Sequence, residues 1–252
     1  MCTVSWSRRP GGYDLFFNRD ELNTRAPEQP PARQEQAGTS FLAPRDGDHG
    51  GTWLLANEFG LTVCLLNDYA NRWRPSETGA RHSRGHLVLA CAAAESPEDV
   101  AAIANAQPLG RTLPFQLVTL APDAPPLVLH WTGSALVRNY DRDLRPPLSS
   151  SSYATNEVIA LRTWRFAFFV RGRDEPDPAD LAAYHRQYYR GSGPHSVLMH
   201  RPDAATRSIC HVCVDEREVR LDYQPVRWKF QGPDFGEMTA HALARRMAAC
   251  EL

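Results

Sequence analysis

Two short runs of β-forming residues open the chain, and a turn with two glycines joins them. Residues 2–7 and 13–17 are rich in β-branched and aromatic side chains, which favour strands. The connection contains Gly11-Gly12, and glycine adopts the positive φ angles that tight hairpin turns require. We therefore predict an antiparallel hairpin at the start of the fold. Because its second strand returns toward the beginning of the first, the polar residues 18–21 should lie close to Cys2.

Cys2 directly follows Met1. Cysteine is small, so we expect Met1 to be removed, which would leave Cys2 with a free α-amine beside its thiol. The ordinary pKa of such an amine is about 7.7–8.0, and that of a free thiol is about 8.5. A residue of this kind can be nucleophile and base at once, because its own amine can take the proton that its side chain loses. The alternative is an inert cysteine, since one cysteine alone says little about function.

The composition is that of an ordinary globular protein. The 252 residues are 42% apolar and 23% charged with a net charge of −1, and nothing indicates a nucleic-acid partner. No linker separates two differently patterned halves, so we predict one domain over residues 1–252. No apolar run approaches the about 20 residues of a membrane span, and no signal segment opens the chain. With six cysteines and no secretory leader, we expect reduced thiols and a cytoplasmic location.

The remaining chain alternates irregularly between strand and helix patterns. Further strands are expected at residues 51–56, 61–67, 115–120, 127–131, 135–140, 196–200, 208–214 and 219–223. Helices are expected at residues 83–94, 97–106, 156–169, 178–189 and 237–250. The Pro- and Gln-rich stretch 25–38 has no periodicity and reads as a long surface loop, either disordered or a lid. The absence of regular βαβ alternation favours an α+β fold in which helices cover antiparallel sheets.

Four ordered blocks carry a family resemblance. Asn18-Arg19-Asp20-Glu21, after a Met-Cys start, resembles the signature of the NRDE family, also called the transport-and-Golgi-organisation-2 family. The blocks Gly50-Gly51-Thr52-Trp53, Leu65-Leu66-Asn67 and Ser83-Arg84-Gly85 are similar to family blocks in the same order. The resemblance covers residues 1–106 well, is weak through 107–190 and returns at Thr206-Arg207-Ser208.

That family resembles N-terminal-nucleophile hydrolases, most closely the choloylglycine-hydrolase group. The resemblance implies an αββα sandwich and the cleavage of linear amides by an N-terminal cysteine, here Cys2. It also implies that Arg19 and Asp20 surround the nucleophile, although the spacing is one residue out, so that Glu21 is an alternative to Asp20. Asn67 would help to hold the oxyanion, and a late-strand arginine, Arg207, would support the site.

One block departs from the amidase pattern. Leu148-Ser149-Ser150-Ser151 places Ser150 where the amidases keep an oxyanion asparagine. Loss of one such donor costs about 2.7–4 kcal/mol of transition-state stabilisation in a well-studied hydrolase. Hydrolysis would then be weakened, redirected to another reaction, or absent. Trp53 is expected to pack between sheet and helix and, if it borders the pocket, to contact substrate together with Ser150.

Two classes of function follow. In the first, the protein is a cysteine-dependent hydrolase or transferase that acts on a linear non-peptide C–N bond, amide or amidine-like, of a small molecule and requires no cofactor. In the second, it is a non-catalytic carrier of haem or of an acyl-CoA or lipid; the chain has 9 His but no Cys-Pro or Cys-x-x-Cys-His haem motif. A homo-oligomer is compatible with either class.

A metal site is a third interpretation, and the sequence gives it little support. Cys210-His211-x-Cys213 and the pair of His82 and His86 supply ligand types that zinc prefers. Side chains three positions apart on a strand point to opposite faces, however, so Cys210 and Cys213 should diverge. We therefore predict that no metal is bound.

Overall fold

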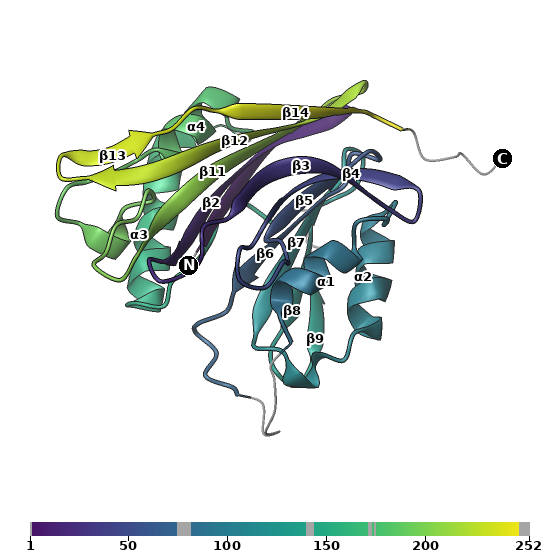
Figure 1. The fold of residues 1–252 in the computed structure, drawn as a ribbon, viewed down its shortest axis with the longest axis horizontal. Coiled ribbons are helices and arrows are strands. Elements are labelled where there is room, and N and C mark those ends of the chain that lie inside the picture. The colour runs from purple at the N-terminus through teal and green to yellow at the C-terminus, as the bar shows by residue number, and fades with distance from the viewer. Residues whose placement is uncertain (1, 75–81, 140–143, 171–172, 174, 247–252) are drawn as a thin grey trace.

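Two β-sheets lie face to face, and helices cover the outer face of each, as Figure 1 shows. This computed structural model describes residues 2–74, 82–139, 144–170, 173 and 175–246. The layers therefore run helices, sheet, sheet, helices, and every strand pairing within the sheets is antiparallel. The predicted αββα architecture is confirmed. None of the helices in the described ranges has the length and apolar character needed to cross a bilayer.

The first sheet carries both ends of the described chain. Its strands are β1 (Cys2–Arg9), β2 (Gly12–Leu22), β10 (Leu148–Ser150), β11 (Ala204–Val214), β12 (Glu218–Lys229), β13 (Gly232–Phe235) and β14 (Thr239–Ala244). The order is β10-β1-β2-β11-β12-β13, with β14 also paired to β12. The predicted N-terminal hairpin is present, and Gly11 in its turn has a φ of 70°.

The second sheet follows the chain order from edge to edge. Its strands are β3 (Gln29–Gln36), β4 (Thr39–Arg45), β5 (Leu54–Asn57), β6 (Thr62–Asn67), β7 (Phe115–Leu120), β8 (Leu127–Trp131) and β9 (Leu136–Asn139). Strands β6, β7, β8 and β9 match the expected ranges closely, whereas β5 begins three residues later than the strand expected at 51–56. Of the strand expected at 135–140, residue 140 lies outside the described residues.

In the described part of the chain, the outer layers consist of the α-helices α1 (Arg84–Ala90), α2 (Pro97–Ala106), α3 (Thr155–Val170) and α4 (Pro178–His185). Short 3₁₀ turns occur at Leu109–Arg111 and Gly193–His195. The start of α2 follows from its sequence, because Ser96 and Asp99 form a reciprocal capping box and Pro97 occupies the first turn. The helices α1 and α4 end about four residues earlier than expected.

Three apolar clusters fill the spaces between the layers. One lies between the sheets, one joins the second sheet to α1 and α2, and one joins the first sheet to α3 and α4. Alternation along β1 serves two of these layers, because Val4 and Trp6 face the second sheet while Thr3 and Ser5 reach α3 and α4. The start of β1 is thus enclosed on both faces.

Residues 25–38 were expected to form a long loop, and this prediction is wrong. They include β3, which pairs with β4 at the edge of the second sheet. Its polar side chains suit an edge strand, and Pro30-Pro31 lies where the register shifts between Gln29 and Ala32, a place that tolerates missing N–H donors. The pairing with β4, rather than local propensity, makes this segment a strand.

The helix expected at 237–250 and the strand expected at 196–200 are also not found. Residues 239–244 form β14, which pairs with the half of β12 that β13 leaves open, and residues 247–250 lie outside the described part of the chain. Residues 196–200 contribute only a single bridge, between His200 and Ala205. Pairing with β12, which the local sequence does not reveal, makes residues 239–244 a strand, whereas residues 196–200 have only that one bridge among the described residues.

Candidate active site

Cys2 lies at the start of β1 and borders a cavity of about 380 Å³. Strand β1 runs between β10 and β2, and the backbone of Cys2 pairs with Ser150 on one side and Arg19 on the other. The Cys2 backbone N–H donates a hydrogen bond to Ser150 Oγ at 3.0 Å. Cys2 is therefore held in place from both sides. The described residues that line the cavity are Cys2, Arg19, Asp20, Glu21, Arg25, Asp46, His49, Gly51, Thr52, Trp53, Leu65, Asn67, His82, Ser83, Arg84, Gly85 and Leu113.

The environment of the Cys2 thiol favours its protonated form. Burial raises the pKa of the Cys2 thiol, and the Asp20 carboxylate acts in the same direction. A thiol is a poor nucleophile until it loses its proton. Attack by Cys2 therefore requires a base close to the sulfur.

Asp20 is fully enclosed behind Cys2, on the side of the first sheet that faces α3. Its Oδ1 accepts a hydrogen bond from Thr206 Oγ1 at 2.6 Å, and its Oδ2 lies 3.6 Å from Arg162 Nη2. Burial raises the pKa of Asp20, although Arg162 opposes this shift. The Asp20 carboxylate thus faces Arg162, whereas the Glu21 carboxylate faces Arg19 and Arg25 at 3.6 and 3.5 Å.

Arg162 on α3 is the arginine that supports this region from within, and sequence reasoning did not single it out. It is completely buried and donates to Thr3 Oγ1 at 2.6 Å and to the Ser196 carbonyl at 2.8 Å. The sequence does contain a sign that Arg162 is buried, because it lies four residues from both Val158 and Phe166, on the buried side of α3. A charge in that stripe requires a buried partner.

Arg207, the predicted supporting arginine, is not brought into the cavity. It sits at the bulge between Thr206 and Ser208, where the pairing of β11 with β2 shifts register, and it is not one of the lining residues. The bulge lets Thr206 pair with Asp20 while Ser208 pairs with Arg19.

Arg19 borders the cavity, and acidic side chains engage its guanidinium. Glu28 Oε2 lies 2.8 Å and Asp46 Oδ2 2.7 Å from its terminal nitrogens. The guanidinium carbon also lies 4.2 Å from the ring centroid of Trp53. These contacts hold Arg19 and Trp53 together as one wall of the cavity, and Trp53 both packs in the core and borders the site.

Asn67 occupies the predicted position at the end of β6 and lines the cavity. Its Nδ2 donates to Tyr69 Oη at 2.9 Å. One amide hydrogen remains for a ligand, because an asparagine amide group has two. Asn67 can therefore supply a hydrogen bond to an oxyanion without giving up Tyr69.

Two glycines set the opposite wall. A Cβ on Gly51 would lie 2.8 Å from the carbonyl carbon of Gly85, and a Cβ on Gly85 would lie 3.0 Å from backbone atoms of Thr52. The Thr52 N–H donates to the Gly85 carbonyl at 3.2 Å. This close approach, which only glycine permits, explains why both glycines occur in their sequence blocks. It also places Arg84, the first residue of α1, in the cavity wall.

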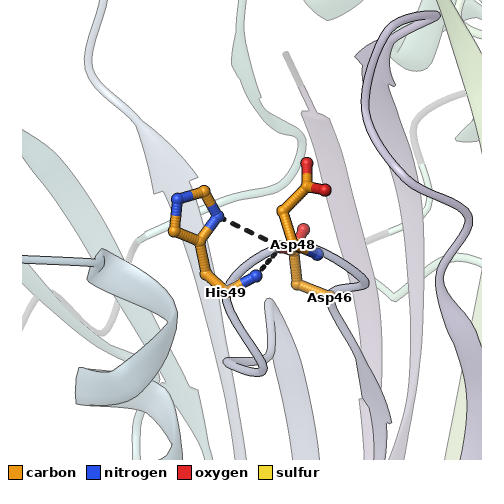
Figure 2. Close-up of side chains that lie close together, drawn as sticks. All are labelled: Asp46, Asp48 and His49. Carbon is orange, nitrogen blue, oxygen red and sulfur yellow. Dashed lines mark hydrogen bonds and ion pairs between the residues drawn. The ribbon is translucent and has the colours of Figure 1, made fainter.

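Asp46, Asp48 and His49 gather on the loop after β4, and their ligand atoms lie within 4.8 Å of one another (Figure 2). Arg25 lies 3.8 Å from the Asp46 carboxylate and 3.5 Å from the Asp48 carboxylate. Its Nη1 is 2.8 Å from His49 Nδ1. A cation already faces every member of the group, which is a poor arrangement for a metal ion.

The other metal ligands considered from the sequence do not converge. Cys210 faces the core between the sheets, while Cys213 lies on the opposite face, 3.3 Å from Arg9 Nη2, as predicted. His211 lies between Asp14 and Asp222, at 2.8 and 3.3 Å. His86 Nε2 contacts the His49 carbonyl at 2.9 Å, and His82 borders the cavity.

The chain is similar to one protein family in sequence and to several solved structures in fold. The sequence model of a family described as Transport and Golgi organisation 2 matches residues 1–153. No curated protein matches the chain. Solved structures also share the fold, and three of them have 9–12% sequence identity to this chain.

A penicillin V acylase from Agrobacterium tumefaciens has a TM-score of 0.58 and 12% identity over 93% of this chain and 84% of its own. A variant of the conjugated bile acid hydrolase from Clostridium perfringens has a TM-score of 0.60 and 11% identity over 100% of both chains. A Caenorhabditis elegans ortholog of N-acylethanolamine-hydrolyzing acid amidase has a TM-score of 0.56 and 9% identity over 84% of this chain and 92% of its own. At such identities the likeness is one of fold.

Proposed function

The chain belongs to the Transport and Golgi organisation 2 family, and we propose that it is an N-terminal-nucleophile amidohydrolase in which Cys2 attacks a linear amide of a small molecule. The observation that carries the proposal is the position of Cys2. Its thiol borders a cavity of about 380 Å³, a size suited to a small ligand. The backbone of Cys2 is fixed by Ser150 and Arg19.

The proposed reaction begins with removal of Met1, which lies outside the described residues. The α-amine of Cys2 then accepts the thiol proton, and the sulfur attacks the carbonyl carbon of the amide. The amine leaves with a proton, a thioester remains on Cys2, and water hydrolyses it to a carboxylic acid. Asp20, close behind Cys2, would orient and charge-balance the protonated amine. The raised pKa of the thiol supports the need for such a base.

Asn67, which lines the cavity, would stabilise the tetrahedral oxyanion through its remaining amide hydrogen. Ser150 is not among the described residues that line the cavity, and its hydroxyl accepts a hydrogen bond from the Cys2 nitrogen. Ser150 would therefore hold the Cys2 backbone, and the reaction would lack the second amide donor expected in amidases. The names of the structural neighbours, which include an acylase, a hydrolase and an amidase, support an amide as the bond that is cleaved.

Acyl transfer to Cys2 can be tested with p-nitrophenyl acetate, an activated acyl donor. The expected result is a burst of p-nitrophenol and one acetyl group on the N-terminal peptide, both absent in Cys2→Ala. Cys213→Ala is the matched control, because Cys213 is the most exposed thiol among the described free cysteines and is expected to acylate only slowly. Acylation that follows exposure, with Cys213 modified before Cys2, would refute the proposal.

A second candidate function, the binding of an acyl lipid without catalysis, is supported by a separate cavity of about 300 Å³. Its lining includes the apolar side chains of Trp6, Leu144, Phe166 and Val170. Its described lining residues include no His, Cys, Met or Tyr, which favours an acyl chain over haem. Calorimetric titration with palmitoyl-CoA tests this function. The carrier would be favoured if Cys2→Ala binds palmitoyl-CoA as the wild-type protein does and if the wild-type protein itself shows no acylation burst.

A further inference from the structure

Among the described residues, three arginines line the Cys2 cavity, and they differ in their partners. Arg19 contacts the carboxylates of Glu28 and Asp46 at 2.8 and 2.7 Å. Arg25 lies between Glu21 and Asp46, at 3.5 and 3.8 Å. For Arg84, no carboxylate of a described residue lies within ion-pair distance.

The hydrogen bonds of Arg84 leave most of its guanidinium unused. Its Nη1 donates to the Pro114 carbonyl at 3.2 Å, and a guanidinium has five N–H donors. Burial lowers the pKa of Arg84, while Tyr69, Cys2 and the more distant Glu21 carboxylate act in the opposite direction. Even so, an arginine side chain stays charged at neutral pH. A cation in a partly desolvated wall, with no carboxylate of a described residue at ion-pair distance, is an unusual and costly arrangement.

Backbone contacts at the start of α1 fix the position of this cation. Arg84 is the first residue of α1, and the close approach of Gly51 to Gly85 holds the start of that helix against the loop before β5. The side chain therefore reaches the same cavity as Cys2 and Asn67. Its charge is presented to whatever occupies the space beside the thiol.

From these observations we propose that Arg84 is the anion-binding residue of the site and that the substrate carries a carboxylate close to the amide that Cys2 attacks. The inference rests on the proposed function, because the ligand is placed relative to the Cys2 sulfur. A carboxylate matches the fork of a guanidinium and supplies the missing charge. Arg19 and Arg25 do not compete for it, since acidic side chains already hold them.

A pair of thiol reagents tests this inference without knowledge of the natural substrate. Iodoacetate and iodoacetamide alkylate a thiol by the same displacement of iodide, and they differ in a carboxylate against a neutral amide. The rate of Cys2 alkylation is measured with each reagent by peptide mapping. The rate with iodoacetate is divided by the rate with iodoacetamide, and this ratio is then divided by the same ratio for free cysteine. For the wild-type protein this corrected ratio should exceed one.

Two substitutions and one control define the role of Arg84. Arg84→Gln should lower the corrected ratio about tenfold or more, because a hydrogen bond to a charged group contributes about 1.5–3 kcal/mol and a factor of ten corresponds to about 1.4 kcal/mol. Arg84→Lys keeps the charge and should retain most of the preference. Arg227→Gln removes one positive charge from an exposed position on β12 and should leave the ratio unchanged.

The outcomes separate the inference from the proposed function. Equal slowing of both reagents in Arg84→Gln would mean that this arginine acts on the thiol, and an unchanged ratio would mean that it binds no anion; either result overturns the inference and leaves a reactive Cys2. A Cys2 that iodoacetamide does not alkylate at all would overturn the proposed function and, with it, the inference. If Arg84→Gln fails to fold, a corrected ratio of one or less in the wild-type protein is by itself a refutation.

Discussion

Replacement of Arg162 by methionine removes the buried cation behind the candidate site. Methionine keeps much of the length and volume of the side chain, so the change concerns charge and hydrogen bonds more than packing. The variant loses the hydrogen bonds to Thr3 Oγ1 and to the Ser196 carbonyl, and the contact with the Asp20 carboxylate at 3.6 Å. It therefore leaves several buried polar groups without this partner.

The size of the effect follows from the burial of the pair. Both side chains, Arg162 and Asp20, are fully inaccessible to solvent. Removal of one partner of such a pair costs about 3–5 kcal/mol, because the remaining charge is buried without its counter-charge. We expect the free energy of unfolding of Arg162→Met to fall by that amount. Asp20 should also become harder to ionise, which would lower the rate of Cys2 acylation.

Urea denaturation followed by tryptophan fluorescence measures the free energy of unfolding. The control is Arg173→Met, which breaks the exposed ion pair with Asp180, 2.7 Å long, and should cost less than about 1 kcal/mol. The double variant Asp20→Asn, Arg162→Met should recover part of the loss, since it removes the stranded charge. A loss below about 1 kcal/mol in Arg162→Met would refute the reasoning that this pair is buried and coupled.

Three further predictions concern the surroundings of the site. Burial lowers the pKa of His185 to about 3, so the unfolded chain binds a proton at a higher pH than the folded protein does. The free energy of unfolding should therefore fall by up to about 1.4 kcal/mol per pH unit as the pH drops below about 6.5. Urea denaturation at pH 7 and pH 5 should show a smaller fall for His185→Gln. Ser150→Ala leaves the Cys2 nitrogen without its acceptor, and we expect denaturation to report a loss of about 1–3 kcal/mol; an unchanged midpoint would contradict the hydrogen bond. Gly51→Ala places a methyl 2.8 Å from a backbone carbonyl carbon and should lower the melting temperature and slow Cys2 alkylation, whereas Gly110→Ala, which meets nothing within 4 Å, should change neither.

Local patterns were sufficient to predict the frame of the site. The glycine turn and the two β-rich runs indicated the first hairpin, and its register brings Cys2 opposite Arg19. The end of the strand at Asn67 was likewise evident from the sequence, as was the start of α2 at Ser96. Each of these features depends on residues that are close together in the chain.

Features that depend on distant partners could not be predicted in this way. Strand β3 is a polar edge segment and β14 an alanine-rich one, and both form strands by pairing with β4 and β12. Arg162 reaches Asp20 across 142 positions of sequence, which no local pattern reports. Arg84 was visible in a sequence block, but its lack of a carboxylate partner emerges only from the folded arrangement.

The proposed chemistry depends above all on the chemical state of the N-terminus. Intact-mass analysis with N-terminal peptide mapping, on protein expressed without an N-terminal tag, reports whether Met1 is present and whether the first amine is free. We expect a mass lower by one methionine residue and an unmodified α-amine on Cys2. A protein that keeps Met1, or that carries an acylated amine at Cys2, would contradict the proposed chemistry.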